Sequence, residues 1–91
     1  MPRKLILSGI VQGVCCRQYC SSYGKKLRIR GAASNLSDGS VRVLLDTDDN
    51  DIVKEYIHSL VNNPGRLSFW GRIDDVRVYE YDGRIRGDYN F

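Results

Sequence analysis

Residues 4–27 read KLILSGIVQGVCCRQYCSSYGKKL, and this stretch decides the fold. Its first five residues place both leucines on one face, which predicts a β-strand over residues 4–8. Gly9 and Gly13 then bracket a turn-rich segment. Beyond it, apolar residues recur at helical spacing and predict an amphipathic helix with a buried stripe of Cys16, Cys20, Tyr23 and Leu27. The polar side of this helix is predicted to carry Gln18, Ser21, Ser22, Lys25 and Lys26.

Outward from this unit, alternating residues predict a second strand over 28–33 and a third over 40–45. The sequence between them, Asn35-Leu36-Ser37-Asp38-Gly39, is typical of a hairpin because the Asp-Gly pair tolerates positive φ. The acidic tract 46–51 is expected to cap a second helix. The wide apolar face of that helix comprises Ile52, Val53, Tyr56, Ile57, Leu60 and Val61.

The helix is expected to stop at Asn62-Asn63-Pro64-Gly65. Val76 and Val78 then mark a fourth strand, and residues 83–91 are expected to return as a short tail strand ending in Tyr89-Asn90-Phe91. Trp70, Phe69 and the tyrosines are expected in the core or half-buried in the sheet.

The predicted order is therefore strand, helix, strand, strand, helix, strand and a tail strand. This is the ferredoxin-like α+β arrangement, βαββαβ, with an antiparallel sheet and two helices on one face. The 91 residues leave room for one domain, so residues 1–91 are expected to form a single domain.

Composition limits the cellular setting and the partners. The net charge of +3 mildly favours anionic partners. No apolar run approaches a membrane span and no signal-peptide core follows the charged start, so we expect a cytoplasmic protein without a membrane partner. Three cysteines within six positions are a poor disulfide framework, and His58 lies too far away to complete a zinc site. We expect reduced thiols, no metal and no cofactor.

The turn between the first strand and the first helix is a candidate anion site. Backbone N–H groups are unpaired at a helix start and converge with the positive end of the helix dipole. Residues 12–17, Gln12-Gly13-Val14-Cys15-Cys16-Arg17, occupy this position. Gly13 lets the backbone close around a ligand, and the planar guanidinium of Arg17 suits a phosphate group. A tight turn followed by a solvated arginine is the alternative interpretation.

Two segments of the chain resemble the acylphosphatase family. Residues 9–17 resemble its signature G-x-V-Q-G-V-x-F/M-R at every fixed position except the one before the arginine. Residues 31–41 resemble a second family segment, G-aromatic-x-basic-N-x-x-x-G-x-V. The separation of the two segments, the chain length and the aromatic-ending tail also agree with a free-standing member of this family.

The resemblance implies hydrolysis of acyl phosphates, the mixed anhydrides of a carboxylic acid and phosphoric acid. It implies that the phosphate-binding loop comprises Gln12, Gly13, Val14, Cys15, Cys16 and Arg17, and that Asn35 orients the attacking water. A carboxylate leaves without a general acid, so holding the phosphoryl group and placing one water suffice. The implied partners are a small acyl phosphate and inorganic phosphate, bound by a monomer that needs no metal.

The chain departs from the family pattern at Cys15, Cys16, Ala32 and Ser34. Many members have glycine where this chain has Cys15, and glycine in an anion-binding loop signals positive φ or close approach to the ligand. A positive φ at Cys15 would therefore store backbone strain. The other three departures alter packing near the loop and the second strand.

Three other interpretations compete with this one. A cysteine near the helix start could be a phosphatase nucleophile, but thiol phosphatases place it where this chain has Val11. A ferredoxin-like nucleic-acid-binding module would need exposed aromatic residues on its central strands, where the candidate positions are Leu5, Leu7, Val41 and Val43. The basic run Lys25, Lys26, Arg28 and Arg30 is then a solvated face. A relative that binds phosphate with little or no activity is the third alternative.

Overall fold

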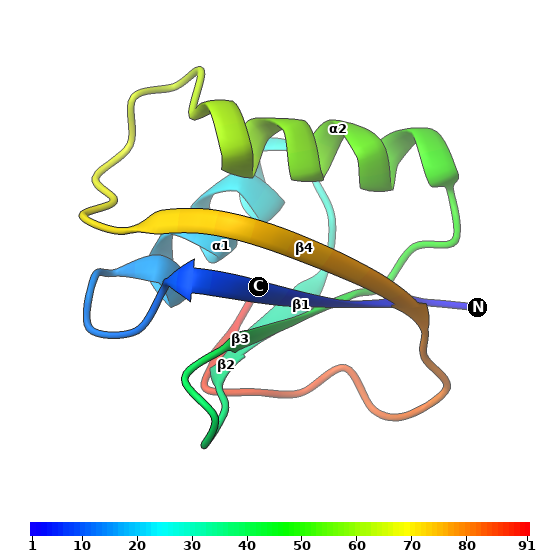
Figure 1. The fold of residues 1–91 in the computed structure, drawn as a ribbon. Coiled ribbons are helices and arrows are strands. Elements are labelled where there is room, and N and C mark those ends of the chain that lie inside the picture. Colours follow the sequence, from blue (N-terminus) through cyan, green and yellow to red (C-terminus); the bar gives the residue numbers. More distant parts are fainter.

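The computed structural model describes residues 1–91 and contains the predicted order of elements (Figure 1). In chain order these are β1 (Arg3–Ile10), α1 (Cys16–Lys26), β2 (Gly31–Asn35), β3 (Val41–Leu45), α2 (Asn50–Asn62), β4 (Arg72–Glu80) and β5 (Tyr89–Asn90). Neither helix is long and apolar enough to span a membrane.

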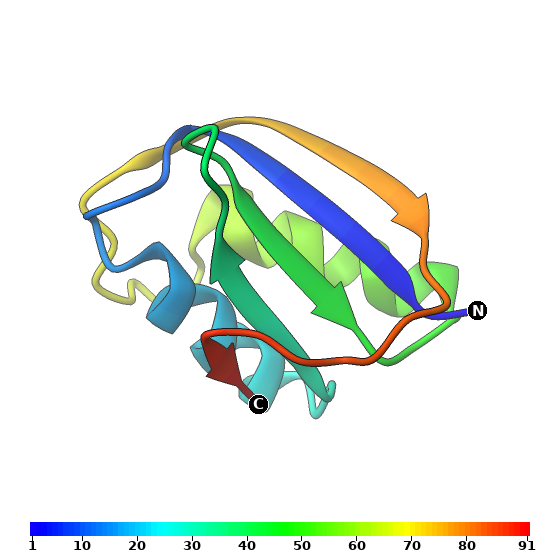
Figure 2. The ribbon, with the colours of Figure 1, turned by 90° about the horizontal axis from the view of Figure 1, so that it is seen from below.

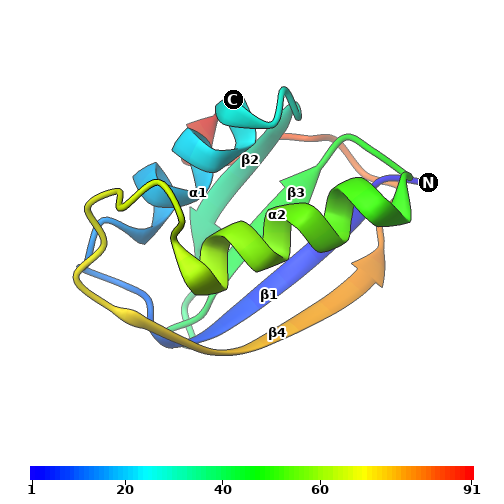
Figure 3. The same ribbon diagram turned by 90° about the horizontal axis from the view of Figure 1, so that it is seen from above.

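The five strands form one antiparallel sheet in the order β4-β1-β3-β2-β5. Both helices lie against the same face of this sheet, as Figure 3 shows from above. The predicted ferredoxin-like α+β fold is confirmed. Because β1 and β3 pair antiparallel, with Leu7 opposite Val41, the turn that leaves β1 and the hairpin that precedes β3 lie at the same end of the sheet.

The core lies between the sheet and the helices. Leu5 and Leu7 of β1 pair directly with Val43 and Val41 of β3, and all four side chains are fully buried. Cys16, Cys20 and Tyr23 of the predicted helical stripe are buried against them. Burying apolar side chains at these positions stabilises the fold and fixes the register of β1 against β3.

Several exposure predictions are wrong. Val61, expected on the apolar face of α2, is 56% exposed, and Tyr79 and Tyr89 are exposed as well. Ser21, expected on the polar side of α1, is buried because β5 packs along this helix and widens its buried face. Trp70, expected in the core or half-buried, is 77% exposed and lies in the segment between α2 and β4. Phe69 takes the inward position beside it and stacks on Tyr19 with ring centroids 4.5 Å apart.

The second strand begins later than predicted. β2 starts at Gly31, whereas residues 28–30 belong to the turn after α1. Arg28 adopts a left-handed backbone with φ of 58°, and the N–H of Ile29 donates to the Gly24 carbonyl 2.8 Å away. Residues 28–30 therefore form the connection that follows α1, although their sequence alternates like that of a strand.

The turn and cap predictions are confirmed. Gly39 ends the β2–β3 hairpin with φ of 94°. Asp49 caps α2 by accepting hydrogen bonds from the N–H groups of Asp51 and Ile52, at 2.9 and 3.3 Å. Asn63 ends that helix in a left-handed conformation.

The C-terminal segment crosses part of the face of the sheet that the helices leave open. Figure 2 shows the chain after β4 crossing this face before it reaches β5. Ala32 and Leu44, which share this face, are consequently buried. The Phe91 backbone closes the edge by exchanging two 2.8 Å hydrogen bonds with Gly31. A Cβ at position 31 would lie 2.7 Å from the Phe91 ring and would overlap the Leu44 carbonyl oxygen.

This crowding yields a stability prediction. Replacing Gly31 with Ala should lower the free energy of unfolding by about 1–3 kcal/mol, the usual cost of overpacking a filled site. Thermal denaturation followed by circular dichroism measures the effect. Gly65→Ala is the milder comparison and should cost less, since the nearest atom to its Cβ, the Tyr23 hydroxyl oxygen, would lie 3.2 Å away and not overlap it. Equal melting temperatures for Gly31→Ala and the wild type would show that the sheet edge can shift to accommodate the added Cβ without loss of stability.

Candidate active site

The loop between β1 and α1 turns on two residues with left-handed backbones. Gly13 has φ of 72°. Cys15, at the N-terminal cap of α1, has φ of 64° and ψ of 24°. This alternation of conformations directs successive N–H groups into one concave surface, the arrangement called an anion-binding nest. The positive φ considered for Cys15 from the sequence is therefore present.

The N–H groups of this loop have no acceptor inside the protein. No backbone N–H from residues 13 to 18 donates a hydrogen bond to a backbone or side-chain group. The first hydrogen bond of the helix is donated by Tyr19 to the Cys15 carbonyl, 3.0 Å away. Several free donors thus coincide with the positive end of the α1 dipole. Such a surface can bind an anion without any added charge.

Gln12 fixes the loop rather than lining its concave side. Its side-chain Nε2 donates to the carbonyls of Leu36 and Ser40, at 2.6 and 2.9 Å. These two carbonyls belong to the β2–β3 hairpin that carries Asn35. The loop and the end of β2 are therefore held together by one side chain, which sets their relative position.

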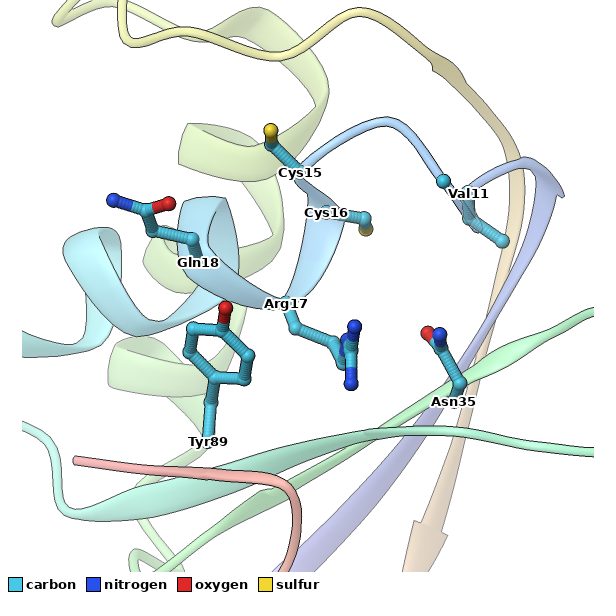
Figure 4. Close-up of a pocket in the computed structure, with 8 residues that line it drawn as sticks. Val11, Cys15, Cys16, Arg17, Gln18, Asn35 and Tyr89 are labelled. Carbon is cyan, nitrogen blue, oxygen red and sulfur yellow. The ribbon is translucent and has the colours of Figure 1, made fainter.

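Arg17 projects from the first turn of α1 toward the end of β2 (Figure 4). Its Nη1 donates to Asp88 Oδ2 at 3.1 Å, and its guanidinium carbon lies 5.1 Å from the centre of the Tyr89 ring. The guanidinium is thus held by a carboxylate and by a cation–π contact from the tail. No other hydrogen bond uses its remaining N–H donors.

Asn35 is the last residue of β2, and its amide lies across the cavity from Arg17 (Figure 4). Its side-chain oxygen Oδ1 is buried and accepts no hydrogen bond. A buried amide oxygen without a partner costs roughly 1–3 kcal/mol. Unpaired groups of this kind are rare in folded proteins, which makes Asn35 a candidate for binding a ligand or a water molecule.

A cavity of about 190 Å³ joins these groups. It is lined by Val11, Gly13, Cys15, Cys16, Arg17, Gln18, Asn35 and Tyr89. The structure thus brings together the residues expected from the two sequence segments, except that Gln12 and Val14 do not line the cavity. Sequence reasoning missed Val11, Gln18 and Tyr89, and it missed Asp88 beside them. The aromatic tail was the available signal for Tyr89.

Of the three cysteines, Cys15 and Cys16 line the cavity and Cys20 does not. The hydrogen bond with Cys20 lowers the pKa of the Cys16 thiol. Cys16 and Cys20 are buried, with their sulfur atoms 4.0 Å apart. The hydrogen bond with Cys16, together with burial, raises the pKa of the Cys20 thiol well above its ordinary value. Cys15 is exposed, but its side chain points away from Arg17 and Asn35 (Figure 4).

Two other expectations bear on the site. The positions considered for base stacking, Leu5, Leu7, Val41 and Val43, are fully buried under the helices and cannot contact a nucleic acid. No group of three or more His, Cys, Asp or Glu side chains lies close enough to hold a metal ion.

Comparison with known proteins identifies relatives of this chain. The model of the family described as Acylphosphatase matches residues 3–91. Acylphosphatase from Caldanaerobacter subterraneus is 38% identical over 84 residues, which cover 90% of this chain and 88% of that protein. Acylphosphatase from Lactococcus lactis is 34% identical over 77 residues, covering 81% and 79% respectively.

Solved structures share the fold. The crystal structure of acylphosphatase from Bacillus subtilis has a TM-score of 0.74 and 22% identity, with 94% of this chain and 93% of that chain covered. The structure of an acylphosphatase from Coxiella burnetii has a TM-score of 0.70 and 24% identity, with 97% and 84% covered.

The left-handed backbone at Cys15 yields a second prediction. A residue with a Cβ stores about 1–2 kcal/mol of strain in this conformation. Glycine removes the strain but adds unfolded-state entropy worth about 0.4–1 kcal/mol. Cys15→Gly should therefore stabilise the protein by up to about 1 kcal/mol and raise the melting temperature by a few degrees.

The controls separate strain from thiol chemistry. Cys15→Ala removes the thiol, retains the Cβ and should not raise the melting temperature. Arg28→Gly relieves another left-handed residue, one that does not line the cavity, and should stabilise in the same way. All melts are run under reducing conditions. A Cys15→Gly protein that melts below the wild type would contradict the strain argument.

Proposed function

The chain belongs to the acylphosphatase family and hydrolyses acyl phosphates, and we propose that it does so with Arg17, Asn35 and the loop of residues 12–17. The observation that carries this assignment is the position of Asn35, which lines the same cavity as Gly13, Cys15 and Arg17 and whose buried Oδ1 has no hydrogen-bond partner. The loop N–H groups can donate to a phosphoryl group, and Asn35 Oδ1 can accept a hydrogen bond from a water molecule beside it.

In this proposal the loop and Arg17 bind the phosphoryl group. The N–H groups of residues 13–18 hold its oxygens, and the free donors of the Arg17 guanidinium bind a further oxygen. Charge on the equatorial oxygens of the transition state is then stabilised by donors already in place, which avoids the cost of reorienting solvent. Gln12 contributes by fixing the loop, and Val14 and Cys16 contribute backbone groups.

Asn35 orients the water molecule that attacks the phosphoryl group. Its Oδ1 accepts a hydrogen bond from a water molecule and orients the water lone pair toward phosphorus. The water oxygen forms a bond to phosphorus as the bond to the acyl oxygen breaks. The products are a carboxylate and inorganic phosphate, and the carboxylate leaves without protonation because it is a weak base.

The remaining expectations are part of the same proposal. Residues 1–91 act as one acylphosphatase domain, working as a monomer on a small acyl phosphate in the cytoplasm. No step of the mechanism uses a metal ion, a cofactor or a nucleic acid. Hydrolysis of acetyl phosphate, measured with and without a chelator, tests this: release of phosphate should be fast and unaffected by the chelator.

The first site prediction concerns Arg17. Replacing it with Ala should cost on the order of 3 kcal/mol of transition-state stabilisation, a fall in kcat/KM of about a hundredfold or more. Arg17→Lys should recover little activity, because a point charge does not reproduce the planar set of donors. Steady-state hydrolysis of acetyl phosphate measures both. Activity close to wild type in Arg17→Ala would remove this residue from the site.

The second site prediction concerns Asn35. Asn35→Ala should lower kcat severely while the inhibition constant of inorganic phosphate changes little, since the interaction is used mainly in the transition state. Asn62→Ala is the matched control, because Asn62 is exposed at the end of α2 and bonds only within that helix. Equal losses of turnover and of phosphate affinity would instead make Asn35 a phosphate ligand.

A further inference from the structure

The Arg17 guanidinium contacts Asp88, which lies outside both segments that resemble the family, residues 9–17 and 31–41. Asp88 Oδ2 accepts from Arg17 Nη1 and from the backbone N–H of Asn35, each at 3.1 Å. One carboxylate oxygen therefore joins the residue assigned to phosphate with the strand end that carries the residue assigned to water. We propose that Asp88 is a positioning residue for acyl phosphate hydrolysis, a role that rests on the assignment of Arg17 above.

The turn that carries Asp88 is fixed from several sides. The Asp88 N–H donates to Ser34 Oγ at 3.0 Å. The Asn90 side chain accepts from the Gly87 N–H and donates to the Gly87 carbonyl, each at 3.0 Å. A Cβ on Gly87 would overlap Ser34 Oγ, so only glycine lets the turn approach β2 this closely. These contacts determine where the carboxylate lies before any ligand binds.

The geometry leaves Arg17 able to bind phosphate while Asp88 holds it. Asp88 engages a single nitrogen, Nη1, and the Nε and Nη2 donors have no partner in the protein. With Nη1 held by Asp88 and the ring of Tyr89 beside it, the guanidinium presents its remaining donors in one orientation. A preoriented donor avoids an ordering cost in the transition state, and a misplacement of about 1 Å can cost a hundredfold in rate.

The ion pair between Arg17 and Asp88 contributes little to the stability of the fold. The side chains of Arg17 and Asp88 are 35% and 46% exposed, and ion pairs this exposed typically contribute little to folding. The departure from the family pattern at Ser34 has a role here, because its hydroxyl receives the Asp88 N–H. Ser34 and Asp88 thus act as a pair that fixes the tail beside the cavity.

The test compares kcat with phosphate affinity in variants of Asp88. Asp88→Ala should lower kcat for acetyl phosphate about tenfold or more, while the inhibition constant of phosphate stays within about threefold or tightens because a nearby negative charge is lost. The melting temperature should not change. Asp88→Asn keeps an oxygen that can accept both hydrogen bonds, so it should recover most of the lost kcat.

Asp75→Ala is the matched control. Asp75 accepts from Arg77 at the same 3.1 Å on exposed β4, and its removal should leave kcat and phosphate inhibition unchanged. In an Arg17→Ala background, Asp88→Ala should cost less than about threefold more, since no guanidinium remains to be positioned.

Each alternative result has one meaning. Unchanged kcat in Asp88→Ala, joint loss of kcat, phosphate affinity and melting temperature, or a full further loss in the Arg17→Ala background would overturn the role of Asp88. An Asp88→Asn protein as slow as Asp88→Ala would also overturn it. If Arg17→Ala itself retained full activity, the assignment of Arg17 would fail first, and the two failures are therefore distinguishable.

Discussion

Gly13 and Cys15 both adopt left-handed backbones, and between them they turn the chain from β1 into α1 with its N–H groups directed to one side. The candidate site depends on this turn. It leaves a row of donors without partners at the positive end of a helix dipole, an arrangement that costs free energy until an anion or water binds. Gln12 then ties the turn to the β2–β3 hairpin, so that Asn35 lies at a fixed distance from the donors.

The surrounding fold supplies rigidity at this end of the sheet. β1 and β3 pair in the centre with fully buried leucines and valines, so the ends of these strands are held by the best-packed part of the molecule. The tail adds a third anchor, because β5 pairs with β2 and brings Asp88 and Tyr89 to the Arg17 guanidinium. A site that relies on placed dipoles rather than on a reactive side chain needs such support on all sides.

Local sequence predicted much of this arrangement. The helix stripe, the Asp-Gly hairpin and the loop between β1 and α1 depend on neighbouring residues, so their patterns could be read directly. Ser21 was misplaced because its burial depends on β5, which packs against α1 from a distant part of the sequence. Asp88 could not be found at all, since it reaches Arg17 only through the pairing of Ala33 with Tyr89 across the sheet edge. No spacing or local pattern encodes that pairing.

We propose that the free N–H groups of residues 13–18 bind the phosphoryl group. Titration of ¹⁵N-labelled protein with inorganic phosphate, followed by backbone amide chemical shifts, measures this directly. We expect saturable shifts concentrated on residues 13–18, together with the Arg17 side chain, and no comparable shift on β4. Saturable binding that left the loop amides unmoved, or that shifted β4 instead, would contradict it.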